Sequence, residues 1–226
     1  MIVDHRTYYI KPVRVGDWLD LWQRMALPYQ MKYLGGFVGM FTCDVGDLNQ
    51  VVHMWAYADQ GARERQRDEM NRDPGWTEFR MAVKESGLVE HQDTKILKPV
   101  PFSPLQEVPS PEITVAKPSC VIDHRTYTCH GGMLGDFLEL WERMALPYQL
   151  KYLGGMVGMF TCDVGNDLNQ VLHLWKYADQ GDRERRRTAM YEDPGWLEYV
   201  KALKESGYIR KMETKILKPV PFSPLK

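Results

Sequence analysis

Residues 94–104 read TKILKPVPFSP, and residues 214–224 repeat the same letters without a change. The segment DHRTY at Asp4–Tyr8 also returns, at Asp123–Tyr127. Because two separate segments recur in the same order and at nearly the same spacing, the duplicated stretch must be much longer than either of them.

Aligning residues 4–105 with residues 123–225 requires one inserted residue, Asn166, and leaves most aligned positions identical. A repeat of this length corresponds to a whole domain and not to a solenoid unit of roughly 20–50 residues. We therefore predict two superimposable domains. The predicted division is a first domain at 1–105, a Pro-containing linker at 106–120 and a second domain at 121–226.

Each copy carries signals in the order strand, helix, strand, strand, helix, strand. Strands are indicated by β-branched and aromatic residues, and helices by apolar residues at three- and four-residue spacing. In the first copy strands are expected at 2–9, 37–44, 49–57 and 90–97, and helices at 16–28, 59–71 and 74–87. This order predicts an α+β fold of two ferredoxin-like (βαββαβ) units. A domain of roughly 100 residues with an aromatic strand face needs cover on both sides, so the units should pair within the chain.

Bulk composition narrows the function classes. The chain has 226 residues, 26% of them charged, and a formal net charge of −1, which argues against a nucleic-acid partner. No apolar run approaches the ~18 residues of a membrane span, and the start of the chain reads as a strand and not as a leader, so we expect a soluble, cytoplasmic protein without a membrane partner.

The four cysteines show no CxxC spacing and are expected to be reduced. Acidic residues Glu64, Glu69 and Glu184 are interleaved with arginines at 63, 65 and 67 and at 183, 185, 186 and 187, a pattern that predicts a solvated helix face.

Several motifs together resemble the NIPSNAP family. They are Arg6-Thr7-Tyr8 in the first strand, the strand His53–Tyr57, the pair Arg63-Glu64 and the ending Pro101–Pro104. The resemblance covers nearly all of each copy and leaves out only the linker. It implies a dimeric α/β-barrel, which the two copies could form within one chain, and the Trp-rich helices leave room for a further homo-oligomer.

The resemblance also implies two classes of function. The wider barrel superfamily includes small-molecule monooxygenases, haem-using enzymes and isomerases, which favours a protein that binds or transforms a small molecule in a barrel cavity. Animal relatives are linked to vesicle traffic and mitophagy signalling, which favours a non-enzymatic interaction module using surfaces and the Pro-rich tails. Whether the chain is an enzyme is left open by the sequence.

The third strand carries the best candidate chemistry. Alternation places Val51, His53, Trp55 and Tyr57 on one face and Val52, Met54 and Ala56 on the other. We expect the small apolar face to meet the helices and the polar face to line an interior cavity of the barrel. The predicted catalytic residues are His53 and His173, because the pKa of histidine lies near neutrality. The predicted ligand-binding residues are Arg6, Tyr8, Trp55, Tyr57, Arg125, Tyr127, Trp175 and Tyr177, with arginine as a clamp for carboxylate or phosphate.

A purely structural role is the alternative for each of these residues. A single His on a strand is commonly a hydrogen-bonded core residue, and Trp55 is an ordinary strand residue. A buried Arg6 needs a carboxylate partner, for which Asp4 and Asp44 are the candidates. Trp18, Trp22 and Met25 are expected in the core. No metal or cofactor is predicted, because the sequence has no HxH, HExxH, Walker or dinucleotide motif.

Overall fold

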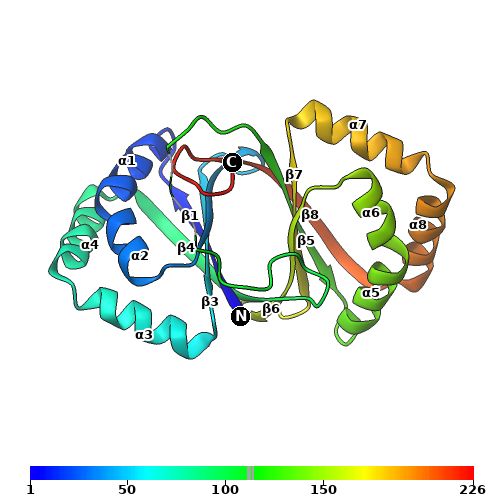
Figure 1. Ribbon diagram of the computed structural model, residues 1–226, viewed down its shortest axis with the longest axis horizontal. Coiled ribbons are helices and arrows are strands. Elements are labelled where there is room, and N and C mark those ends of the chain that lie inside the picture. The colour runs from blue at the N-terminus through cyan, green and yellow to red at the C-terminus, as the bar shows by residue number, and fades with distance from the viewer. Residues whose placement is uncertain (111–112, 114) are drawn as a thin grey trace. The chain divides into compact units, whose positions relative to one another are not determined.

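The computed structural model describes residues 1–110, 113 and 115–226, so Pro111, Glu112 and Thr114 of the predicted linker lie outside the described residues. The first copy contains β1 (Ile2–Ile10), α1 (Val15–Met25), α2 (Leu27–Tyr33), β2 (Phe37–Val45), β3 (Gln50–Tyr57), α3 (Gln60–Asn71), α4 (Pro74–Ser86) and β4 (Val89–Pro99) (Figure 1). The second copy contains β5 (Val121–Cys129), α5 (Leu134–Leu140), the π-helix η1 (Trp141–Ala145), α6 (Leu146–Tyr152), β6 (Met156–Val164), β7 (Gln170–Tyr177), α7 (Gln180–Tyr191), α8 (Pro194–Ser206) and β8 (Ile209–Pro219).

The sheet confirms the predicted fold class. Strand β1 pairs antiparallel with both β3 and β4, β2 pairs with β3, and the second copy repeats the β1–β3 and β2–β3 pairings as β5–β7 and β6–β7. The strand order β1-β3-β2-β8-β5-β7-β6-β4 is that of a closed barrel. The α+β architecture therefore consists of two βαββαβ units in one chain.

The chain divides into two compact units that exchange their ends relative to the repeat. Unit 1 consists of residues 1–97, 107–118 and 217–226, and unit 2 of residues 98–106 and 119–216. The predicted domain boundaries lie where the sequence repeat begins and ends, whereas the boundaries of the compact units are set by which residues contact one another. In unit 1 the hydroxyl Oγ of Ser223 accepts a hydrogen bond from the Met40 amide at 3.1 Å. In unit 2 the Oγ of Ser103 accepts one from the Met159 amide at 3.0 Å.

The helix boundaries follow from local chemistry. Asp73 caps α4 by accepting a hydrogen bond from the Gly75 amide at 3.0 Å, and Gly87 ends the helix at a φ of 56°, a left-handed conformation that glycine adopts without strain. Pro28 lies in the first turn of α2, where its missing N–H leaves no helical bond unmade. The single helix expected at 16–28 is therefore two helices: α1 ends at Met25, and α2 begins at Leu27 and continues to Tyr33.

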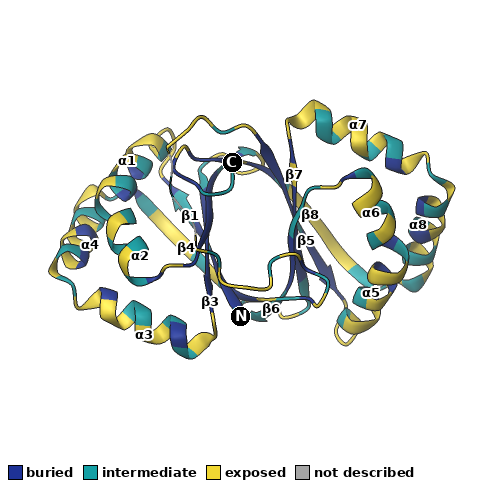
Figure 2. Cartoon of the chain, viewed as in Figure 1, coloured by how far each residue is buried: buried dark blue, intermediate teal, exposed yellow. Residues whose placement is uncertain are grey.

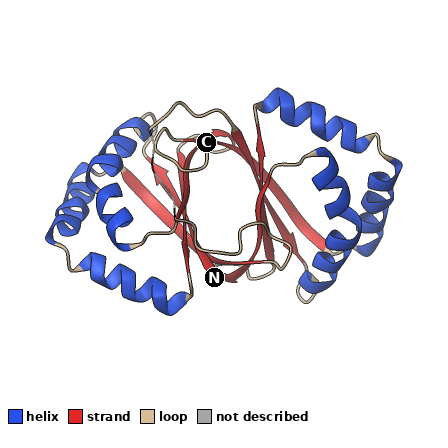
Figure 3. Cartoon of the chain, in the orientation of Figure 1, coloured by secondary structure: helices blue, strands red, loops and turns tan. Residues whose placement is uncertain are grey.

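Within unit 1, α1, α2, α3 and α4 lie on the same side of the β1–β3 strands (Figure 3). Strands β1, β2 and β3 are buried along most of their length and β4 is for the most part exposed or half-buried, whereas the helices bury one face and expose the other (Figure 2). Trp18 and Trp22 of α1 are each 1% exposed, which confirms the core position expected for them. The space between these helices and the sheet contains the candidate site.

Candidate functional site

The polar face of β1 and β3 lies beneath the helices. The two strands pair so that Arg6 stands opposite His53 and Asp4 opposite Trp55. Opposite residues of an antiparallel pair project to the same face of the sheet. The His53 ring lies 5.9 Å from the ring of Trp22 in α1, with the two planes nearly perpendicular. The strand residues that carry polar atoms therefore meet α1 and its neighbours.

This placement corrects the sequence-based orientation. Alternation identified the two strand faces, but the face with His53, Trp55 and Tyr57 covers the helix side and does not line a barrel interior. Trp55 and Tyr57 belong to the same hydrophobic core as Trp22. Large rings bury more apolar area against helices than small side chains do, so this face gains most from the helical cover. In the second copy, His173, Trp175 and Tyr177 also lie on the helix side.

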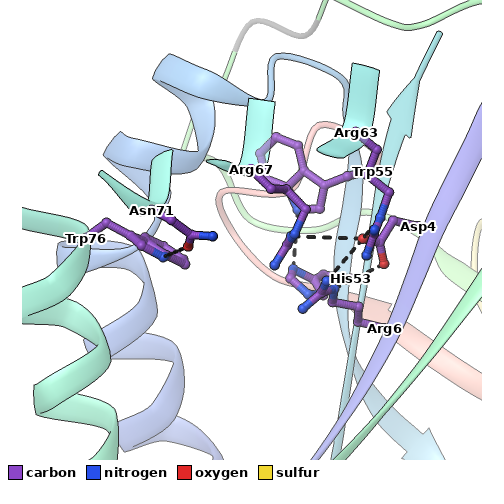
Figure 4. Close-up of polar contacts among 8 residues, drawn as sticks. All are labelled: Asp4, Arg6, His53, Trp55, Arg63, Arg67, Asn71 and Trp76. Carbon is purple, nitrogen blue, oxygen red and sulfur yellow. Dashed lines mark hydrogen bonds and ion pairs between the residues drawn. The ribbon is translucent and has the colours of Figure 1, made fainter. Parts of the chain in front are cut away.

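A buried carboxylate with three guanidinium groups forms the floor of the site (Figure 4). Asp4 Oδ1 accepts a hydrogen bond from Arg6 Nε at 3.0 Å, Asp4 Oδ2 accepts one from Arg63 Nε at 2.7 Å, and Arg67 Nη1 lies 3.9 Å from the same Oδ2. Burial alone would raise the pKa of Asp4, but Arg6 and Arg63 outweigh it and hold the pKa below its ordinary value. The expected partner of Arg6 is therefore confirmed as Asp4.

The same cluster corrects the predicted solvated face of α3. Arg63 and Arg67 are only 23% and 22% exposed, because both reach over the sheet towards Asp4. Arg65 between them is exposed, as expected. Burial lowers the pKa of Arg67, and the positive charge of Arg6 lowers it further. One carboxylate and three guanidiniums leave the floor with an excess of positive charge.

The second copy rebuilds this floor around Asp123. The carboxylate accepts hydrogen bonds from Arg125 Nε at 3.1 Å, Arg183 Nε at 2.7 Å and Thr214 Oγ1 at 2.7 Å. Burial works against ionisation here too, but Arg125, Thr214 and Arg183 together hold the pKa of Asp123 below its ordinary value. Arg187, the repeat equivalent of Arg67, is half-buried beside this group.

His53 and His173 are neutral hydrogen-bonding groups. Trp55 Nε1 donates to His53 Nδ1 at 3.3 Å, and Trp175 Nε1 donates to His173 Nδ1 at 2.8 Å. Burial lowers the pKa of each histidine to about 3, and the neighbouring Arg6 or Arg125 lowers it further. Because Nδ1 accepts a hydrogen bond, the single ring proton of each neutral imidazole resides on Nε2.

Above the floor of unit 1 lies a cavity of about 420 Å³, which we name cavity 1. Its buried part is lined by aromatic and polar side chains, and its mouth by the exposed residues Asn71, Arg80 and Gln92. The remaining lining residues are Arg6, Tyr8, Trp18, Trp22, Gln30, His53, Arg67, Trp76, Phe79 and Val83.

Unit 2 has a cavity of about 580 Å³ in the equivalent place, which we name cavity 2. Arg125, Tyr127, Gln149 and Arg187 occupy positions equivalent to lining residues of cavity 1. The other lining residues are Trp141, Tyr191, Trp196, Tyr199, Val200, Leu203, Lys204, Gly207, Ile209, Arg210, Lys211 and Met212.

Three residues that line cavity 1 carry a buried polar atom without a protein partner. His53 Nε2, Gln30 Oε1 and Trp18 Nε1 make no hydrogen bond to any described residue. A buried polar atom left unpaired costs roughly 1–3 kcal/mol of stability. Two of these atoms, the ring nitrogens, carry protons, so the cavity offers hydrogen-bond donors near a positively charged floor.

The structure brings some predicted site residues together and separates others. Arg6, Tyr8 and His53 line cavity 1, and Arg125 and Tyr127 line cavity 2. The other predicted residues lie in or against the hydrophobic cores and are Trp55, Tyr57, His173, Trp175 and Tyr177.

Sequence reasoning missed the contributions from the helices. Arg67, Trp76 and Gln30 line cavity 1. Trp18 and Trp22 belong to the hydrophobic core and also line the cavity. The available signal was the recurrence of an arginine three to four residues apart along α3, since residues at that spacing share one helix face. No group of three or more His, Cys, Asp and Glu side chains that could hold a metal ion occurs in the described part of the chain.

Comparison with known proteins places the repeat in a family. The NIPSNAP family model matches residues 3–104 and 122–224. The chain belongs to the NIPSNAP family. A NipSnap homolog of Dictyostelium discoideum is 29% identical over 184 residues, covering 81% of this chain and 74% of the relative. The NipSnap homolog 1 of Danio rerio is 30% identical over 203 residues, covering 88% and 67%.

Solved structures agree with the tandem fold over its full length. A candidate monooxygenase of Fusobacterium nucleatum aligns with a TM-score of 0.64 at 10% identity, covering 100% of this chain and 94% of that one. An anthrone oxidase-like protein aligns with a TM-score of 0.61 at 9% identity, covering 97% and 91%. At these identities the likeness shows the fold alone. In the described residues, no helix is both long and apolar enough to cross a membrane.

Proposed function

We propose that cavities 1 and 2 bind small molecules that carry an anionic group. The observation behind the proposal is the charge of the floor: one buried carboxylate faces three guanidiniums, two of which, Arg6 and Arg67, also line cavity 1. Guanidinium groups recognise carboxylate and phosphate through paired N–H donors. An anion in the cavity would balance the excess positive charge that Asp4 leaves uncompensated.

The rest of the cavity wall indicates the body of the ligand. Trp18, Trp22 and Trp76 provide apolar, planar surface, and Tyr8 lies 5.2 Å from the ring of Trp18. A cavity of this composition favours a ligand with an apolar or aromatic body and one charged end. The proposal keeps the small-molecule function inferred from the sequence but assigns it to the space between helices and sheet.

We assign His53 the role of a hydrogen-bond donor to this ligand. His53 lines cavity 1, its buried Nε2 has no hydrogen-bond partner among the described residues, and its Nδ1 accepts a hydrogen bond from Trp55. With a pKa lowered to about 3, the imidazole stays neutral at physiological pH and is a weak base. The acid–base role predicted from the sequence stays a prediction, and ligand binding by Nε2–H requires no change of protonation.

The alternative function, an interaction module that uses the Pro-rich tails, receives less support. Val220, Phe222 and Ser223 are at most 2% exposed, and the Phe222 ring stacks on Trp22 with centroids 5.6 Å apart. A partner that bound this tail would first have to remove it from the core of unit 1.

A pair of isosteric probes tests the proposal. Titration with 1-naphthoate and with neutral 1-naphthamide, followed by tryptophan fluorescence and calorimetry, should show binding of the anion at least tenfold tighter, since charge-assisted hydrogen bonds are about twice as strong as neutral ones. Arg67→Met should weaken naphthoate binding at cavity 1, and the matched control Arg65→Met, on the exposed face of α3, should not. Equal affinity for the two probes, or an unchanged affinity in Arg67→Met with a retained melting temperature, would contradict the proposal.

A further inference from the structure

The two cavities share a floor but differ at the mouth. Counting along the repeat, Asn71, Arg80 and Gln92 of cavity 1 correspond to Tyr191, Val200 and Met212 of cavity 2. Three polar groups are thereby replaced by apolar ones. From these differences we infer that cavity 2 selects anions with a long or bulky apolar body, whereas cavity 1 selects shorter anions with a polar distal end. This inference rests on the proposed function.

The exposure of the mouth residues supports the assignment. Tyr191 is 48% exposed and Met212 is 54% exposed, so cavity 2 presents apolar side chains to solvent. An apolar ligand chain that covered them would remove this surface from water, and each buried methylene contributes about 0.8 kcal/mol. At the mouth of cavity 1, the exposed groups are an amide at Gln92 and a guanidinium at Arg80, which an apolar chain would desolvate without compensation.

The position of Asn71 also changes what lies inside the cavity. In unit 1, Trp76 Nε1 donates to Asn71 Oδ1 at 3.1 Å, as Figure 4 shows. In unit 2, Tyr191 does not accept a hydrogen bond from Trp196; its ring packs edge-on against that indole, with centroids 5.7 Å apart. The indole Nε1 of Trp196 consequently has no hydrogen-bond partner among the described residues. Cavity 2 is the larger of the two, and its mouth carries the aromatic ring of Tyr191 where cavity 1 carries the amide of Asn71.

Charge does not distinguish the cavities. Arg210 and Lys211 border cavity 2, but Arg210 is paired with Asp167 at 2.6 Å and Lys211 with Glu213 at 2.8 Å. Lys204 remains near the mouth as a cation, as Arg80 does in cavity 1. The expected difference therefore concerns the apolar body of the ligand and not its anionic group.

Chain-length dependence of carboxylate binding tests this inference. Butanoate, hexanoate and octanoate are titrated calorimetrically into Arg187→Met, which leaves cavity 1 intact, and into Arg67→Met, which leaves cavity 2 intact. At cavity 2 the affinity should rise about fourfold for each added methylene that is buried. At cavity 1 it should rise less steeply or level off by octanoate, while adipate should bind more tightly than hexanoate.

Reciprocal substitutions test whether the mouth residues set the dependence of affinity on chain length. Val200→Arg with Met212→Gln should flatten the chain-length dependence at cavity 2, and Arg80→Val with Gln92→Met should steepen it at cavity 1. Melting temperatures establish that each variant is folded. Equal slopes at the two cavities, or slopes that the substitutions leave unchanged, would overturn this inference alone. Failure of every carboxylate and of naphthoate to bind the parent protein would overturn the proposed function with it.

Discussion

Cavities 1 and 2 have the same floor and different mouths. Asp4 and Asp123 are each paired with arginines from their own strand and from one helix, α3 or α7. Asn71 and Arg80 at one mouth, in contrast, are replaced by Tyr191 and Val200 at the other. This difference indicates that the floor residues and the mouth residues of the cavities are under different constraints.

The floor is constrained by folding. A carboxylate that is 1% exposed or less can stay ionised only with its partners in place, so no member of the cluster can change without cost. The mouth residues touch solvent and stabilise little, so they are free to set which ligand enters. The predictions below test this separation between floor and mouth, beginning with the largest expected effect.

Removing the floor carboxylate should have the largest effect. Asp4→Asn and Asp123→Asn each leave buried guanidiniums unpaired, and each should lower the free energy of unfolding by about 3–5 kcal/mol. The measurement is urea denaturation at neutral pH. Asp44→Asn is the control, because its pair with Lys218 is partly exposed and should contribute less than about 1 kcal/mol. Very unequal losses for Asp4 and Asp123 would show that the two floors are not equivalent.

The two histidines should produce a matched acid sensitivity. In the folded state the pKa of His53 and of His173 is about 3, well below the ordinary value of about 6.5 in an unfolded chain. The stabilising contribution is therefore complete above about pH 6.5 and is lost as the pH falls towards 3, because only the unfolded chain takes up the proton. His53→Gln and His173→Gln should each reduce the slope of unfolding free energy against pH by about 1.4 kcal/mol per pH unit in this range.

Denaturation series between pH 4 and pH 7 measure those slopes. The parent protein, measured alongside, provides the reference slope. If the two substitutions change the slope by different amounts, the floors differ in how well they exclude the charged imidazole.

Exchanging one mouth residue should change stability by a smaller amount and with opposite sign in the two copies. Asn71→Tyr removes the acceptor of Trp76 Nε1 and should destabilise by about 1 kcal/mol. Tyr191→Asn supplies an acceptor to Trp196 Nε1 and should recover a similar amount, less the packing lost from the Tyr191 ring. Thermal unfolding of both variants provides the comparison. Destabilisation of equal size in both copies would mean that ring packing, and not the indole hydrogen bond, dominates at this position.

The smallest effect is expected in the loops that precede α1 and α5. Val13 has a φ of 62°, whereas Gly132 at the equivalent position has a φ of 84°. A β-branched residue in the left-handed region is strained by roughly 1–2 kcal/mol, but the greater conformational freedom that glycine loses on folding offsets about 0.5–1 kcal/mol of this, so the net effect is small. Val13→Gly should therefore raise the melting temperature slightly, and Gly132→Val should lower it. Because Val13 is 97% exposed, neither change alters packing. A fall in melting temperature for Val13→Gly would contradict this account.

The sequence predicted the order of the elements well, because the signals for them are local. The helices expected at 59–71 and 74–87 are present as α3 and α4, because caps such as Asp73 and Gly87 depend only on neighbouring residues. Alternation likewise identified which side chains of β3 share a face. These features require no knowledge of what packs against the strand.

The orientation of that face could not be obtained from the sequence. Deciding whether His53 meets helices or the other side of the sheet requires the position of α1 and α3, which depends on contacts distant in sequence. The same limit explains the error at Arg63 and Arg67, because arginines interleaved with acidic residues are also what a solvated helix would show. Their role becomes visible only through Asp4, which lies 59 residues from Arg63.

The exchanged tails have a consequence for how the protein is made. Unit 2 needs residues 98–106 and 119–216, and it can be completed as soon as the ribosome has released that stretch. Unit 1 contains the first strand, yet it also needs residues 217–226, including the Ser223 hydroxyl that caps the Met40 amide and the Phe222 ring against Trp22. Domains usually fold in the order of their synthesis. Here unit 1, which contains the first residues to be synthesised, cannot complete its fold until residues 217–226, which follow unit 2 in the sequence, have been made.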